Sequence, residues 1–301
     1  MKRIPTTGKV YLVGAGPGAA DLITVRGAKL LEQADIVFHD ALVEPEMLAL
    51  CPQAIQEAVG KRCGKLSSAQ QFINKRLVDA AKKYQVVVRL KGGDPMMFGR
   101  ADEEIQSLKE ANIEVEVVPG ITAALAGAAS IQKSLTLRGI SRSVAFITLA
   151  QGTDALLLEN TALHQPIANP NADTLVYYMG RNDAARIAQQ LIKQDENSEN
   201  WHENRQHGPD TPVYILEAVS TSRERQWSSN LAELASGQAD HWFDSASPAL
   251  IMVGQALEHK APEIHSNKSE SKHAKDLQSP GTKIDDRLQD GSILTNGRRS
   301  A

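Results

Sequence analysis

The sequence has few cysteines, little net charge and no recurring metal-ligand pattern, and each shortage excludes a class of protein. Its 301 residues contain only two cysteines, Cys51 and Cys63, whose spacing suits neither a CxxC redox motif nor a four-ligand zinc site. We expect buried or idle thiols. Several of the eight histidines lie in polar stretches and form no cluster, so we expect no metal. A formal net charge of -3 gives the whole chain no attraction to nucleic acid or to an anionic membrane.

Signals for secretion and for membrane insertion are also missing. The first ten residues include basic side chains, but no continuous apolar segment of the kind that a signal peptide needs follows them. No stretch approaches the length of a membrane span. We therefore expect a soluble protein in the cytoplasm. With 42% hydrophobic residues, the chain has room for two domains of ordinary size.

Short apolar runs alternate with helical patterns in the first half of the chain, which predicts a parallel sheet covered by helices. We expect strands at 10–13, 35–38, 86–90 and 115–118, and helices at 24–33, 67–83 and 101–111. From about residue 142 the expected strands are richer in aromatic residues and lie at 143–149, 174–179, 212–219 and 249–253, with helices at 184–193 and 231–235. The sequence thus predicts two α/β domains, residues 1–140 and 141–257, the second with a mixed sheet.

The end of the chain, residues 258–301, differs from the rest. Lysine, serine and aspartate dominate it, and its apolar residues are few and isolated. Such a segment cannot bury enough surface to offset the entropy that it would lose on ordering. We expect a disordered tail; binding of a partner is the alternative, but a solvated terminus without a function is the commoner case.

The central motif spans residues 86–104, VVVRLKGGDPMMFGRADEE, where an apolar strand ends abruptly in Gly92-Gly93-Asp94-Pro95. The two glycines allow backbone dihedral angles that a Cβ atom would forbid, and they let the backbone approach a ligand closely. Open α/β sheets bind ligands beyond the carboxyl ends of their strands. A plain turn from strand to helix would explain one glycine and the proline but not the whole string, so the motif favours a binding site.

A second glycine-rich turn, GAGPG at 14–18, follows the first expected strand and fits the dinucleotide pattern GxGxxA, with Asp40 about where a ribose-binding carboxylate would lie. A nicotinamide-dependent dehydrogenase is therefore one interpretation. Against it, Pro17 lacks the N–H group that a pyrophosphate would need, and no hydride-transfer site follows in the sequence. Asp40 has a further interpretation, as the cap of a following helical turn.

The string RLKGGDPMMFGRADEE at 89–104 closely resembles the signature of the tetrapyrrole methylases, a family that transfers methyl groups from S-adenosylmethionine (SAM). The likeness covers roughly residues 9–256 and includes GAGPG at 14–18, DALV at 40–43, GKRCG at 60–64, PGITAA at 119–124, YYMG at 177–180 and SPALIMVG at 247–254. It implies two α/β domains with a cofactor cleft between them. The alanines of PGITAA are explained equally well by close packing of a helix and by approach of a ligand.

The resemblance also implies roles for particular residues. Asp40 is expected to accept a proton during the reaction and Lys61 to donate one. The expected contacts of SAM are Pro17, Gly92, Gly93, Asp94, Met97, Thr122, Ala123, Met179, Val219 and Ala249. The cations expected to bind the carboxylates of the substrate are Arg62, Arg100 and Arg138, with Arg89 and Arg142 as further candidates.

The activity that the resemblance implies is SAM-dependent methylation of uroporphyrinogen III at C2 and C7, which gives precorrin-2 for sirohaem or cobalamin and releases S-adenosylhomocysteine. A methylase of the same fold that acts on a later corrin precursor is an alternative, and so is a non-catalytic protein that binds SAM or a tetrapyrrole. The last stays open because motifs in the second half depart from the family pattern: Leu137 replaces a histidine, Thr148-Leu149-Ala150 replaces TGH, and Glu217-Ala218-Val219 replaces ENG. The family also implies a homodimer.

Overall fold

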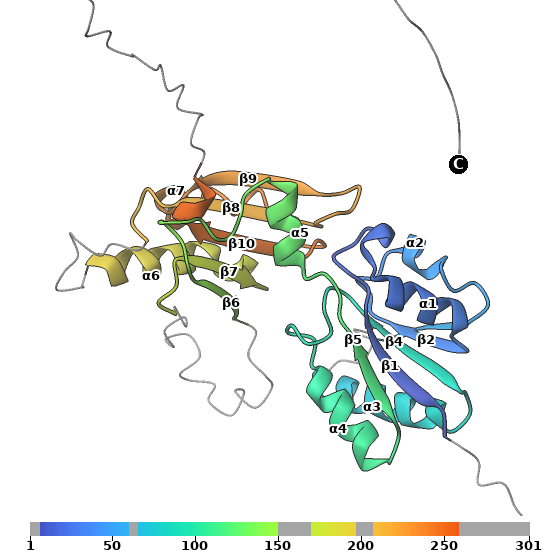
Figure 1. Ribbon diagram of the computed structural model, residues 1–301. Coiled ribbons are helices and arrows are strands. Elements are labelled where there is room, and N and C mark those ends of the chain that lie inside the picture. Colours follow the sequence, from blue (N-terminus) through green and yellow to red (C-terminus); the bar gives the residue numbers. More distant parts are fainter. Residues whose placement is uncertain (1–6, 60–65, 150–169, 197–206, 259–301) are drawn as a thin grey trace, which may run out of the picture. The chain divides into compact units, whose positions relative to one another are not determined.

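The computed structural model describes residues 7–59, 66–149, 170–196 and 207–258, and the described residues belong to one compact unit with two five-stranded sheets (Figure 1). The predicted tail lies outside the described residues except for its first residue, Glu258. Among the described residues, no helix is long and apolar enough to cross a membrane. The division into domains at residue 140 and the cleft between them stay predictions.

The first sheet is entirely parallel, as the alternation of strands and helices predicts, and its strand order is β3-β2-β4-β1-β5. Its strands are β1 (Lys9–Gly14), β2 (Ile36–His39), β3 (Ile55–Ala58), β4 (Val86–Lys91) and β5 (Val115–Val118). Because all five run in the same direction, their carboxyl ends lie at one edge of the sheet. The loops that follow β1, β2, β4 and β5 contain the glycine motifs and Asp40.

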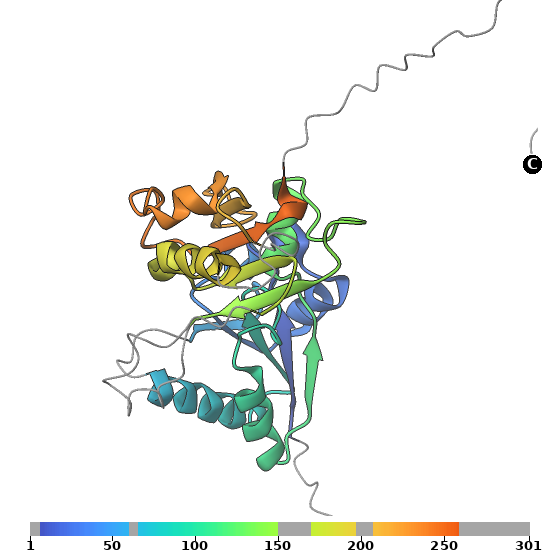
Figure 2. The same ribbon diagram turned by 90° about the vertical axis from the view of Figure 1, so that its left-hand side faces the viewer.

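Helices cover both faces of the first sheet. They are α1 (Val25–Gln33), α2 (Pro45–Leu48), α3 (Leu66–Ala81) and α4 (Ala101–Glu110). On one face, α3 and α4 lie side by side and pack with Val87; on the other, α1 and α2 pack with Val88 (Figure 1 and Figure 2). Successive residues of a strand point to opposite faces, so a strand buried on both faces is mostly apolar, as β4 is except at Arg89 and Lys91.

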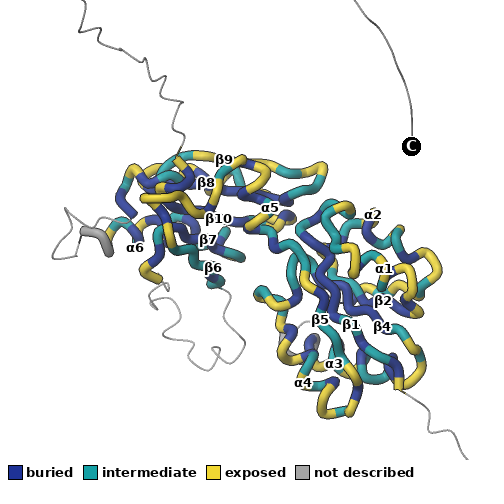
Figure 3. The backbone as a smooth tube through the Cα atoms, in the orientation of Figure 1, coloured by how far each residue is buried: buried dark blue, intermediate teal, exposed yellow. Residues whose placement is uncertain are grey.

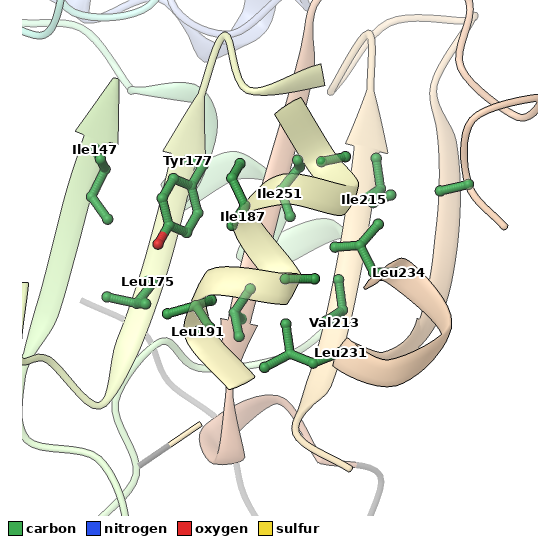
Figure 4. Close-up of a cluster of buried hydrophobic side chains, with 14 of the residues drawn as sticks. Ile147, Leu175, Tyr177, Ile187, Leu191, Val213, Ile215, Leu231, Leu234 and Ile251 are labelled. Atoms are coloured by element: carbon green, nitrogen blue, oxygen red, sulfur yellow. The ribbon is translucent and has the colours of Figure 1, made fainter. Parts of the chain in front are cut away.

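The second sheet is mixed, which confirms the sequence prediction; its order is β6-β7-β10-β8-β9, with only β6 and β7 parallel. The strands are β6 (Val144–Thr148), β7 (Thr174–Tyr178), β8 (Pro212–Glu217), β9 (Arg225–Asn230) and β10 (Ala249–Gly254). Helices α6 (Ala184–Glu196) and α7 (Leu231–Ala235) pack on one face through the cluster drawn in Figure 4. Buried residues concentrate in the strands of both sheets (Figure 3).

Helix α5 (Ala123–Ser130), the short helix of the PGITAA motif, packs on the other face of the second sheet. Ala124 and Ala128 are buried there beside Leu216 and Met252. A Cβ atom added at Gly127 would lie 2.6 Å from Leu216 Cδ1 and 3.0 Å from Met252 Cε, so a larger residue there would require these side chains to move. Close packing therefore explains the small residues inside α5.

The sequence patterns did not predict β3, β9 or α2. Strands β3 and β9 each pair with a single neighbour, at an edge of their sheet, and most of their side chains are exposed or half-buried. Neither of these two strands has the mostly apolar sequence that reveals the predicted edge strands β5 and β6. Helix α2 is a single turn of four residues, too short for a periodic pattern.

Candidate functional site

The glycine loops after β1, β4 and β5 contact one another through their backbones. Gly93 donates a hydrogen bond to the carbonyl oxygen of Gly16 at 2.7 Å, and Gly16 donates one back at 3.2 Å. A Cβ atom added at Gly14 would lie 2.5 Å from the Cα atom of Gly120, and one added at Gly120 would overlap the carbonyl oxygen of Gly93. These loops therefore pack as one unit, and two of its positions accept only glycine.

Gly93 differs from Gly14 and Gly120, because space remains where its side chain would be. Its φ is +70°, in the left-handed region, and a Cβ atom added there would have Thr122 Cα as its nearest neighbour at 4.0 Å. The neighbouring Asp94 uses both carboxylate oxygens within the loops: Oδ2 accepts from Gly120 N at 2.9 Å and Oδ1 from Met96 N at 2.8 Å. Asp94 thus holds the GGDP loop against the PGIT loop and leaves the space beside the Gly93 Cα atom unfilled.

Asp40 lies directly after β2, at the same edge of the sheet. Its Oδ1 accepts a hydrogen bond from Arg89, and its Oδ2 accepts a longer one, 3.4 Å, from Gly92 N. The interpretation as a helix cap is wrong, because α2 begins only at Pro45, after Glu44, and the side chain of Asp40 bonds β4 and the GGDP loop instead. About a third of the Asp40 side chain is exposed, so the carboxylate is open to solvent or to a ligand.

Arg89 was a further candidate for binding the carboxylates of the substrate, and the structure shows that this prediction is wrong. The residue is 2% exposed and its guanidinium bonds Asp40 and Glu104. Burial lowers the pKa of this guanidinium, but the charges of the two carboxylates raise it, and the net shift is upward. Arg89 therefore stays charged as an internal partner of Asp40.

Other residues of the site were not found from the sequence. Glu104 is fully buried and accepts hydrogen bonds from Arg89 Nε at 3.1 Å and from Lys91 Nζ at 3.0 Å. The sequence did contain a signal for a buried carboxylate partner. The alternation of side chains along a strand places Arg89 and Lys91 on the same buried face of β4 as Val87. A charged pair on a buried face requires carboxylate partners, but the sequence does not say which helix supplies them.

The start of α5 is held by a tyrosine that the sequence analysis also missed. Thr122, the residue before the helix, shares a hydrogen bond of 2.6 Å with the hydroxyl group of Tyr178, and Ala124 N donates to the same oxygen at 3.2 Å. The ring of Phe98 stacks edge-on against Tyr178. These contacts connect two expected SAM contacts, Thr122 and Ala123, with the end of β7.

The remaining expected SAM contacts have varied surroundings. Pro17 and Met97 are half-buried in the glycine loops, and Met179 is exposed with a left-handed φ of 56°. Ala249 begins β10 and is half-buried. Val219 is buried in the same apolar cluster as Ala124, so its side chain is not available to a ligand.

The expected substrate-binding cations are only partly described. Arg138 is exposed in the loop after α5. Arg100, also exposed, binds Glu103 with two hydrogen bonds of 2.6 and 2.8 Å and lines a hollow of about 190 Å³. Lys61 and Arg62 lie outside the described residues. The described residues contain no group of three or more histidine, cysteine, aspartate or glutamate side chains that could hold a metal ion, and Cys51 is a buried free thiol.

Comparison with known proteins gives a consistent result. The sequence profile of the Tetrapyrrole (Corrin/Porphyrin) Methylases matches residues 9–235. The chain is 42% identical over 255 residues to the siroheme synthase of Pseudomonas fluorescens, covering 83% of this chain and 50% of that protein. It is 39% identical over 249 residues to the uroporphyrinogen-III C-methyltransferase of Pseudomonas aeruginosa, covering 83% of this chain and 94% of that protein.

A solved structure agrees with the sequence matches. The uroporphyrin-III C-methyltransferase of Thermus thermophilus in complex with S-adenyl homocysteine superposes with a TM-score of 0.63 at 32% identity, covering 83% of this chain and 94% of that one. The chain spans about half the length of the siroheme synthases that it matches. With a profile match over more than half of its residues and these relatives, the chain belongs to the tetrapyrrole (corrin/porphyrin) methylase family.

Proposed function

We propose that this protein transfers methyl groups from SAM to C2 and C7 of uroporphyrinogen III and so forms precorrin-2, for sirohaem or cobalamin. The observation that carries the proposal is the packing of three glycine loops, backbone against backbone, beside the carboxylate of Asp40 at one edge of a parallel sheet. The names of the Pseudomonas aeruginosa relative and of the Thermus thermophilus structure support this substrate and this cofactor.

The loops fit a ligand that lies along the backbone. Gly93 has a left-handed φ and open space where a side chain would be, and Asp94 fixes the loop without occupying that space. We propose that SAM contacts Gly92, Gly93 and Asp94 there, together with Thr122. The other proposed contacts are Pro17, Met97, Ala123, Met179, the backbone of Val219 and Ala249. Bound SAM supplies an electrophilic methyl group, and the loops orient it toward the substrate.

Asp40 is the proposed proton acceptor. Methylation of a pyrrole carbon leaves a proton that must depart before conjugation is restored, and a carboxylate can take it. The hydrogen bonds from Arg89 and Gly92 fix the orientation of Asp40, while its partial exposure leaves it open to the substrate. Lys61 is the proposed proton donor.

The substrate carries several carboxylates, so its binding needs fixed cations. We propose Arg62, Arg100 and Arg138 for this role, because a guanidinium group binds a carboxylate through two parallel hydrogen bonds. A chain with a net charge of -3 can still bind a polyanion when its cations gather locally. The proposal includes the homodimer and the cytoplasmic location expected from the sequence; light scattering after size exclusion and fractionation of the cells test them.

The function is tested with Asp40→Asn, which keeps the size of the side chain but removes its charge and basicity. We expect SAM to bind with nearly unchanged affinity while single-turnover methylation of uroporphyrinogen III slows by roughly 10²- to 10⁴-fold, the usual loss for a general base. The matched control is Asp79→Asn, at an exposed aspartate of α3 that bonds Lys75, which should methylate at the rate of the wild type.

Each outcome separates one interpretation from the others. Full methylation by Asp40→Asn would eliminate the proposed base. Binding of SAM by a wild-type protein that methylates a later corrin precursor but not uroporphyrinogen III would favour the other methylase. Binding of SAM with no methylation of either acceptor would favour the non-catalytic binder. Binding of NAD in place of SAM would contradict the proposal altogether.

A further inference from the structure

Two cations, Arg89 and Lys91, and two carboxylates, Glu104 and Asp40, form one charged network. Arg89 and Lys91 are 2% and 3% exposed and Glu104 is fully buried, whereas Asp40 closes the network at its partly exposed end. The formal charges of the four groups sum to zero. Buried charges are stable only when each has an oppositely charged partner, so removal of one member leaves the rest unbalanced.

Glu104 is the centre of this network. Its Oε1 accepts from Arg89 Nε and, at 3.3 Å, from Gln70 Nε2, while its Oε2 accepts from Lys91 Nζ. The far end of the Arg89 guanidinium donates to Asp40 and to the carbonyl oxygens of Phe38 and Leu90. Arg89 thus bridges Glu104 and Asp40, and its orientation depends on being held at both ends.

The charges and hydrogen bonds of the network come from four places in the fold. Strand β4 provides both cations, the residue directly after β2 is Asp40, α4 provides Glu104, and α3 provides the neutral Gln70. Beside Asp40, His39 pairs through Nδ1 with the carbonyl oxygen of Asp40 and not with its carboxylate. Glu103 and Asp102, the other acidic residues in the first turn of α4, are exposed.

We propose that Glu104 is a positioning residue for Asp40: it holds Arg89 in place and offsets the charge of Lys91, and so preserves the basicity of the carboxylate that accepts the proton. The proposal rests on the proposed function of Asp40. Without the charge of Glu104, an excess positive charge would remain beside Asp40 and would favour its ionised, less basic form. Without the charge of Lys91, the effect would have the opposite sign.

The opposite signs give a test that a purely structural role would fail. Glu104→Gln, Lys91→Met and the double variant are compared with Glu110→Gln, a matched change at an exposed position of the same helix. The titration of Asp40 is followed by carbon NMR of its carboxyl group, assigned with Asp40→Asn. We expect the titration midpoint to move in opposite directions in Glu104→Gln and in Lys91→Met, and to return near that of the wild type in the double variant.

The methylation rate should follow the same order. Single turnover is measured against pH at saturating SAM, and we expect Glu104→Gln to be slower by up to about tenfold, with recovery in the double variant and no change in Glu110→Gln. The affinity for SAM should stay constant throughout, because none of these side chains belongs to the glycine loops.

Several results would overturn the proposal. Shifts of the Asp40 pKa in one direction for both single variants, or a double variant worse than either, would make Glu104 a packing residue only. If Glu104→Gln does not fold, Lys91→Met alone must still raise the pKa of Asp40. Absence of methylation by the wild type would refute the proposed function, but the NMR titration would still decide whether Glu104 sets the charge around Asp40.

Discussion

Gly93 offers the sharpest test of the proposed SAM site, because a methyl group can be added there without a clash inside the protein. In Gly93→Ala, the nearest atom to the new Cβ would be Thr122 Cα at 4.0 Å. The same change at Gly120 would drive the Cβ into the carbonyl oxygen of Gly93 and would test folding instead. Gly93→Ala therefore acts on the space beside the loop and on the backbone conformation alone.

The backbone conformation has a calculable cost. An alanine at a φ of +70° pays about 1–2 kcal/mol relative to glycine, which should lower the Tm by roughly 2–8 °C for a protein of this size. If SAM lies against the Gly93 backbone, the added methyl group overlaps it. Overpacking of that kind costs about 1–3 kcal/mol, so the Kd for SAM should rise roughly 5- to 150-fold.

Gly139 provides the matched control. Its φ is +81° and a Cβ added there would meet no atom within 4 Å, so Gly139→Ala has the same backbone cost without a ligand beside it. Calorimetric titration of SAM and a thermal melt are recorded for both variants and for the wild type. We expect similar losses in Tm, but a weaker affinity only in Gly93→Ala. An unchanged Kd in a folded Gly93→Ala protein would remove the GGDP loop from the SAM site.

Two further predictions concern Tyr178 and Lys91. Tyr178→Phe should lower the free energy of unfolding by about 1–2 kcal/mol, because the N–H group of Ala124 at the start of α5 loses its acceptor; an unchanged midpoint of urea unfolding would contradict this. Burial, together with the charge of Arg89, lowers the pKa of Lys91 below 10.5, so between the two values the unfolded chain binds more protons and stability should rise with pH. Lys91→Met should remove that rise, as measured by urea unfolding at a series of alkaline pH values.

The parts of the fold that could be predicted from the sequence are those in which a local pattern determines the structure. The apolar run of β4 is buried on both faces, and its abrupt end in glycines marks the carboxyl edge of the sheet. Parallel strands then place every such loop at one edge, so the meeting of GAGPG, GGDP and PGIT follows from the alternation of strands and helices.

Strands β3 and β9 and the short helix α2 could not be predicted because no such pattern exists in them. β9 has the sequence RQWSSN and is a strand because its backbone pairs with β8, not because one of its faces is apolar. Strand β8, which precedes β9 across a turn, determines the extended structure of β9 through this pairing. The same holds for β3, which among the described strands pairs with β2 alone.

The misassignment of Arg89 has a different cause. An arginine in a strand beside a glycine loop has the same sequence signature whether it binds a ligand or an internal carboxylate. What decides is its register: Arg89 lies opposite Phe38 in the ladder with β2, one position inward of the pair His39–Leu90, and on the face covered by α4. Asp40 and Glu104 are 49 and 15 residues away in sequence, and only the folded sheet brings both within reach of one guanidinium.

Register also explains why the charged network and the glycine loops are separate parts of one site. Along β4, Val87, Arg89 and Lys91 point to the face covered by α4, and none of their side chains bonds the contact glycines 14, 16, 93 and 120. The loops bond one another through their peptide groups and leave a space beside Gly93, where the proposed cofactor would fit by its shape. Asp40 is the residue that belongs to both parts, because one of its oxygens bonds Arg89 and the other the N–H group of Gly92. We therefore expect a change in the network to alter the proposed proton transfer by Asp40 while the glycine loops keep their geometry.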